Sequence, residues 1–149
     1  MPNDVTTVAS RAVRDLSVKW DQLGYVDEPT FVAATIELAT EVTVDQQPRI
    51  GATWTLDTPV LFQAAIFETM SRLMYQVLNQ YYSAVLSTES ITLGPITLSQ
   101  QRNEMVSKDI LANAQLWHVR AESKLVAGGA QGRRAALRNW IPQCRIVVV

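Results

Sequence analysis

Apolar residues recur every three or four positions near the N-terminus, a spacing typical of an amphipathic helix. The pattern predicts a first helix over roughly Asp4–Trp20, with Asn3 or Asp4 as its cap and its end at residues 23–25. A second helix is predicted to begin at residues 27–29, because proline is favoured at a first helical position. Residues 45–57 are predicted to form a loop, because Pro48 and Gly51 break regular structure, and a short strand at 52–56 is the alternative.

Two long helices are the strongest prediction from the periodicity. Thr58 can cap the first, Pro59 suits its first position, and the apolar pattern continues to about Ser87. A helix of that length is a rod of roughly 40 Å and must pack against several others or another copy. The second runs from about Gln100 to Val126 and ends at two glycines. Its predicted buried face comprises Met105, Ile110, Leu111, Ala114, Leu116, Trp117, Ala121 and Leu125.

Between these helices, residues 90–99 alternate strictly between polar and apolar on both sides of Gly94-Pro95. Such alternation is typical of a β-hairpin. An isolated two-stranded hairpin is only marginally stable, so this one would need a helix or another subunit's strand packed beside it. The residues predicted to make this subunit contact are Ile91, Leu93, Ile96 and Leu98.

The fold class predicted from these elements is mainly α. We expect a helical bundle domain over residues 1–128, with two long helices and the short hairpin between them, followed by an extended C-terminal arm over 129–149. The arm combines cations, one large aromatic and a β-forming apolar end. That end is an aggregation hazard unless it pairs, either internally or with another protein's sheet. Trp140 is interpreted equally well as an anchor for another surface or as a side chain folded back on its own bundle. The predicted partner-binding residues are Arg133, Arg134, Arg138, Trp140, Arg145, Ile146, Val147 and Val148.

Charge divides the 149-residue chain unevenly, although its net charge is only −1. Residues 1–60 carry nine acidic and four basic side chains, whereas residues 119–149 carry one acidic and six basic ones. This asymmetry suits head-to-tail contact between copies or a basic tail on an acidic partner. Chance, or cations near a helix C-terminus, explains it equally well.

The sequence contains no recognised catalytic motif, so we expect no enzyme activity, no cofactor and no metal. The single histidine, His118, is expected at a helix surface or boundary, and the single cysteine, Cys144, is expected to be inert. Glu37 and Glu41 are four residues apart, a spacing that favours a solvated stripe over a metal site. No apolar run is long enough for a membrane span, and the polar N-terminus gives no sign of a signal peptide.

The order of elements resembles that of the head-to-tail adaptor (connector) proteins of tailed bacteriophages. Residues 57–67, with a proline-started helix and an Ala-Ala step, are similar to that family's long helix, and the segment 90–99 with its C-terminal extension is similar in layout. The resemblance implies a structural virion protein of the phage neck that is made in the host cytoplasm. It implies a ring of copies of this chain with the twelve-fold symmetry of the portal. It further implies contacts with the portal protein and with tail or neck proteins, and a lumen through which DNA passes without specific binding.

An alternative hypothesis is a cytoplasmic helical protein that binds nucleic acid or a regulatory partner through residues 129–149. That hypothesis predicts salt-dependent affinity for DNA or RNA. The affinity would vanish when Arg133, Arg134 and Arg138 are replaced by alanine.

Overall fold

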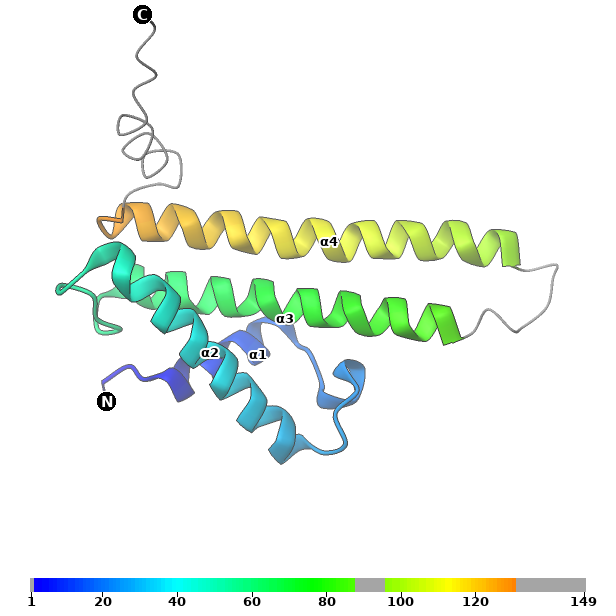
Figure 1. Ribbon diagram of the computed structural model, residues 1–149, viewed down its shortest axis with the longest axis horizontal. Helices are drawn as coiled ribbons and strands as arrows, with labels where there is room; N and C mark the ends of the chain where they lie inside the picture. The colour runs from blue at the N-terminus through cyan, green and yellow to red at the C-terminus, as the bar shows by residue number, and fades with distance from the viewer. Residues whose placement is uncertain (1, 88–95, 131–149) are drawn as a thin grey trace, which may run out of the picture.

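The middle layer of the fold is a single long helix with other helices on both sides of it (Figure 1). The computed structural model describes residues 2–87 and 96–130, without the side chains of 82–87 and 96–105. In those ranges the chain is mainly helical, with α1 (Val5–Leu16), the 3-10 helix η1 (Trp20–Leu23), α2 (Glu28–Ile50), α3 (Pro59–Ser87) and α4 (Ile96–Ala127). α1, η1 and α2 pack on one side of α3, and α4 packs along the other. The predicted helical bundle is confirmed.

The first two helices begin at aspartate caps. The carboxylate of Asp4 accepts the Thr7 backbone N–H at 2.7 Å, and that of Asp27 accepts the Thr30 N–H at 2.8 Å. The first helix ends earlier than predicted, at Leu16, because Ser17 takes a left-handed conformation with φ of 54°. The chain then turns into η1, so Trp20 belongs to a separate turn rather than to α1.

The predicted loop over residues 45–57 is partly wrong, because α2 continues to Ile50 with Pro48 inside its last turn. Proline removes one helical hydrogen bond, but here only two helical residues follow it. Contacts hold that turn: Gln46 is buried and donates to the Ala64 carbonyl at 3.2 Å, and Arg49 pairs with Glu122 on α4. The helix ends at Gly51, where φ is 85°, and residues 52–56 form turns instead of a strand.

The predicted hairpin is wrong in its second half. Residues 96–99, which include Ile96 and Leu98, form the first turn of α4, and the part of the chain that the structure describes contains no strand. Ile91 and Leu93 lie outside the described residues. Adding four residues to a helix that is already nucleated costs little, whereas a short two-stranded hairpin needs external support. An alternation of polar and apolar residues over so few positions is too short to distinguish a strand from the first turn of a helix.

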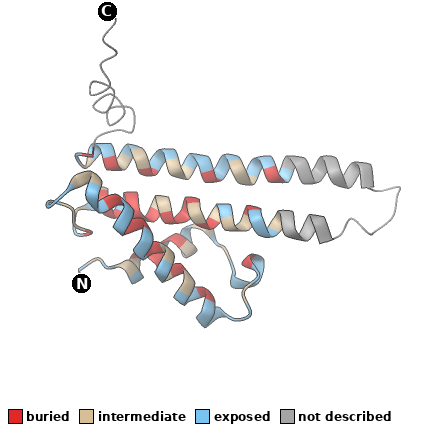
Figure 2. Ribbon diagram, in the orientation of Figure 1, coloured by how far each residue is buried: buried red, intermediate tan, exposed pale blue. Residues whose placement is uncertain are grey.

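The main core lies where α1 and α2 meet α3. It contains side chains from all three helices and from η1, including Val8, Ala12, Leu23, Phe31, Val42, Phe62, Met70 and Leu73. A smaller cluster, at the end of the bundle where α4 finishes, joins Leu61 and Ala64 on α3 to Leu125 and Ala130. Figure 2 shows buried residues concentrated along α3, which is expected of a helix packed on two sides.

The Asp27 cap makes part of the stability of α2 dependent on pH. Hydrogen bonds from Thr30 hold the pKa of the Asp27 carboxyl below its ordinary value of 3.8, because they favour the charged form. Its contribution is therefore complete above about pH 4 and is lost as the pH falls through the lowered pKa of the folded state. We expect Asp27→Asn, which keeps an acceptor but cannot titrate, to have a thermal midpoint that changes less with pH below pH 4 than that of the unaltered chain.

Circular dichroism melts between pH 2 and pH 7 would measure this difference. Glu28→Gln, which removes a neighbouring carboxylate with no cap bond, is the matched control. Identical pH profiles for Asp27→Asn and the unaltered chain would contradict the prediction.

Candidate interaction surfaces

One side of α4 packs on α3 through small residues. Ala114 and Ala121 are completely buried, and Ser107 and Leu125 are nearly so. The hydroxyl of Ser71, itself 1% exposed, donates to the Ala114 carbonyl at 2.7 Å. Because these side chains are small, the two helices approach closely, and this contact fixes which side of α4 faces outward.

The outward side of α4 displays a mostly apolar stripe that the described part of the chain leaves exposed. We name this the outer stripe: Ala112, Leu116, Val119, Ser123 and Val126, all exposed. Leu116, Val119 and Val126 are 44%, 62% and 49% exposed, although each is a large apolar side chain. The spacing alternates between four and three residues, the heptad period by which one helix packs against another.

Basic side chains flank the outer stripe. Lys108 and Arg120 are both exposed, as is the acidic Asp109 next to Lys108, and the Arg120 guanidinium lies over the Trp117 ring at 4.8 Å from its centroid. Trp117 in turn packs against Phe67 of α3, with 5.4 Å between the ring centroids. The stacking holds the cation of Arg120 at the edge of the stripe instead of leaving it free in solvent.

The outward side of α2 has the opposite charge. Five residues line a shallow hollow of about 370 Å³, which we name the acidic hollow: Glu37, Thr40, Glu41, Val44 and Asp45. All five are exposed. Arg72 of α3 reaches its edge, where it pairs with Asp45 at 2.5 Å and lies 3.9 Å from Glu41. Glu37 and Glu41, predicted as a solvated stripe, are indeed exposed to solvent.

Ion pairs connect the three longer helices behind these surfaces. Glu68 on α3 lies 2.8 Å from Nδ1 of His118 on α4 and 3.5 Å from Arg72. Burial alone would lower the pKa of the Arg72 guanidinium, but hydrogen bonds and charges from Asp45 and Glu68 raise it overall. His118 is half-buried, which confirms its predicted boundary position. Glu68 is 50 residues from His118 in the sequence, so only the fold brings the two side chains together.

A second tie joins α2 directly to α4. The Arg49 guanidinium donates two hydrogen bonds to the Glu122 carboxylate, at 2.7 and 2.8 Å. The hydrogen bond to Glu122 raises the pKa of Arg49 and outweighs the partial burial that would lower it. Both charged groups are thereby satisfied, and they brace the end of the bundle rather than form a reactive site.

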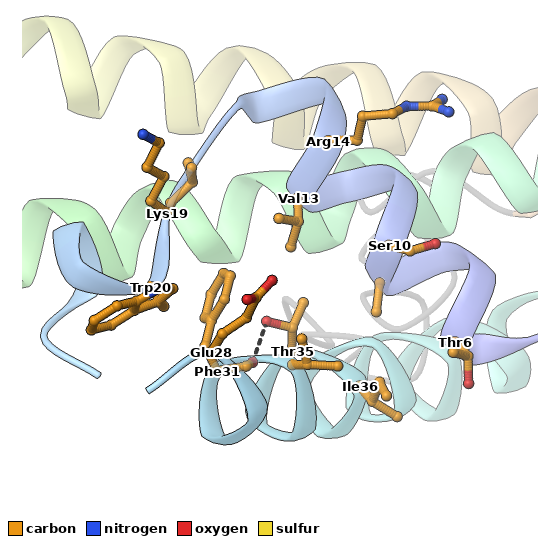
Figure 3. Close-up of a pocket in the computed structure, with 13 residues that line it drawn as sticks. Thr6, Ser10, Val13, Arg14, Lys19, Trp20, Glu28, Phe31, Thr35 and Ile36 are labelled. Atoms are coloured by element: carbon orange, nitrogen blue, oxygen red, sulfur yellow. Dashed lines mark hydrogen bonds between the residues drawn. The ribbon is translucent and has the colours of Figure 1, made fainter. Parts of the chain in front are cut away.

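An apolar groove of about 490 Å³ lies between α1 and α2 (Figure 3). Phe31 forms its floor near η1, and Trp20 stands at one end with 37% of its surface exposed. The hydroxyl of Thr35, in the groove wall, already donates to the Phe31 carbonyl at 2.8 Å. The side chains of Arg14 and Lys19 extend away from the groove, whereas the Glu28 carboxylate lies beside Phe31 and Thr35, so the mainly apolar lining includes an acidic group.

The residues predicted to bind partners lie outside the described part of the chain: Arg133, Arg134, Arg138, Trp140, Arg145, Ile146, Val147 and Val148. The predicted buried face of α4 is wrong at Leu116, which is exposed. The outer stripe was missed because two apolar faces overlap in this helix. Its signal, the alternation of four and three residues from Ala112 to Val126, is present in the sequence.

Within the described ranges, no three His, Cys, Asp or Glu side chains come together in a group that could hold a metal ion. None of the described helices combines the length and the apolar character needed to cross a bilayer. No family model matches the chain, and neither a curated protein nor a solved structure is significantly similar to it.

Proposed function

We propose that this chain is a structural assembly protein whose copies join head to tail, as the adaptor ring between portal and tail in a tailed-bacteriophage neck. The observation that carries the assembly part is the outer stripe. Leu116, Val119 and Val126 are exposed on a helix whose other side buries Ala114, Ala121 and Leu125. Contiguous exposed apolar surface of this kind marks a site of interaction with another macromolecule.

The two outward faces support contact between copies. An apolar face with basic edges lies on α4, and a separate acidic face lies on α2. Two different faces on one molecule favour heterologous contacts, which repeat from copy to copy and close into a ring when the rotation permits.

The finer parts of the proposal come from the resemblance. They are a twelve-fold ring on the portal protein, contact with tail or neck proteins, location in the virion neck, and passage of DNA through the lumen without specific binding. In this proposal Arg133, Arg134, Arg138, Trp140 and Arg145, with the apolar end at residues 146–148, reach the portal or a neighbouring copy. Their cations and apolar side chains suit such a contact.

The test of assembly is direct imaging of the purified chain. Negative-stain micrographs and light scattering behind a sizing column should show rings, or a concentration-dependent oligomer. Replacing both Leu116 and Val119 by lysine should leave a folded monomer, because two charges would enter an apolar contact. Asn113→Lys with Gln115→Lys adds the same charges at exposed positions beside the stripe and should still assemble.

A chain that remains monomeric at every concentration its solubility permits would contradict the proposal. The alternative would then be tested by DNA and RNA binding at several salt concentrations. Affinity that falls with salt, and disappears in the triple alanine variant at Arg133, Arg134 and Arg138, would support a nucleic-acid-binding function instead.

A further inference from the structure

We infer that the outer stripe of α4 in one copy docks on the acidic hollow of α2 in the next copy. This inference rests on the proposed assembly function and identifies the two surfaces that meet. Both surfaces are built from described, exposed residues of regular helices, so each is present in the isolated subunit before assembly.

The occupant of the outer stripe should be a helix. The heptad spacing of its residues matches the way in which side chains of one helix enter the gaps of another. Two of its five positions, Ala112 and Ser123, are small, so a neighbouring backbone can approach closely there. Leu116 and Val119 lie between them as the large side chains that fill the partner's gaps.

A second α4 packed parallel to the first is a poor partner for this stripe. That arrangement would place Lys108 and Arg120 of one helix near the same cations of the other. Like charges that meet in this way weaken an interface and disfavour the parallel pairing.

The outward side of α2 provides the complement. It has small or short side chains at Thr40 and Val44, and it is hollowed between them and the acids. Glu37 has no ionic partner in the described part of the chain, and the Glu41 side chain remains 62% exposed although Arg72 is nearby. Lys108 and Arg120 of an incoming α4 would therefore meet unneutralised carboxylates at the edges of the contact.

The placement of the two faces makes the contact repeat. α2 and α4 each pack on α3, and the residues of the outer stripe and of the acidic hollow are exposed rather than buried against it. When the α4 of one copy covers the α2 of the next, the first copy's own α2 remains available. Assembly therefore continues until a ring closes.

Two charge-reversed variants test this pairing. Variant A carries Lys108→Glu and Arg120→Glu on α4, and variant B carries Glu37→Lys and Glu41→Lys on α2; circular dichroism would verify that each is folded. Each variant alone should associate about tenfold or more weakly than the unaltered chain, because like charges then face each other. An equimolar mixture should recover assembly, since the acidic α4 of A meets the basic α2 of B, and the remaining pair is also complementary.

A single chain that carries all four reversals should also recover assembly. If variant B assembles as well as the unaltered chain, α2 is not the partner, and the inference is overturned while the proposed assembly function stands. Assembly of both variants at unaltered strength overturns it in the same way. An unaltered chain that never assembles contradicts the inference and the assembly function together.

Discussion

Replacing Leu73 by alanine should lower the free energy of unfolding by about 2–5 kcal/mol, the largest stability effect we expect from one substitution in this chain. Leu73 is 1% exposed and belongs to the main core, where α1 and α2 meet α3. Two contributions add up to this loss. Alanine buries less apolar surface on folding than leucine does, and the removed carbons leave a cavity in the core. Urea denaturation followed by circular dichroism measures it.

The matched control is Leu73→Met, which keeps the side-chain volume and should cost less than about 1.5 kcal/mol. Comparable effects from the two substitutions would indicate that shape rather than burial determines stability at this position. A cost of Leu73→Ala below 1 kcal/mol would show that α3 is not held between two layers as described.

Enlarging Ala114 to leucine should have the second-largest effect. Ala114 is completely buried where α4 crosses α3, and its carbonyl accepts the hydrogen bond from Ser71. Three additional carbons cannot fit without separating the helices, so we expect a loss of about 1–3 kcal/mol, or more where the backbone cannot shift. Since α4 packs mainly on α3, that loss should also make α4 easier to cleave by a protease.

Asn113→Leu provides the control, because it introduces the same side chain one residue earlier at an exposed position. It should leave the unfolding midpoint nearly unchanged. Equal losses from the two variants would mean that helix propensity, rather than contact with α3, is responsible. Unaltered stability and protease resistance in Ala114→Leu would contradict the close α3–α4 contact.

Local chemistry predicted the starts of α1, α2 and α3 well, but not that of α4. Asp4 and Asp27 were expected at or beside the first two starts, and each accepts a backbone N–H there. Pro59 was expected as the first residue of the third helix, and α3 begins at that residue. A cap depends on a side chain and a backbone group three residues apart, so a few neighbouring residues suffice to predict it.

Predictions failed where contacts from distant segments outweigh local preference. Pro48 breaks helices in isolation, but Gln46 and Arg49 are held by α3 and α4, and α2 continues past it. Ile96 and Leu98 were predicted to lie in a strand, but they form the first turn of α4. A short two-stranded hairpin needs support from another element to be stable. Leu116 was assigned to the buried face because the sequence does not show which of two apolar faces on α4 contacts α3.

The candidate surfaces divide in the same way. The excess of acids in the first 60 residues is a property of the chain, and it places Glu37, Glu41 and Asp45 on α2 whatever that helix packs against. The helical class, the caps and this charge asymmetry were thus determined by the sequence alone, because each depends on residue type and short spacing. Which side of α4 lies outward, and that the acidic side of α2 is left exposed, was decided only by the tertiary structure, because burial is a relation between segments far apart in the chain.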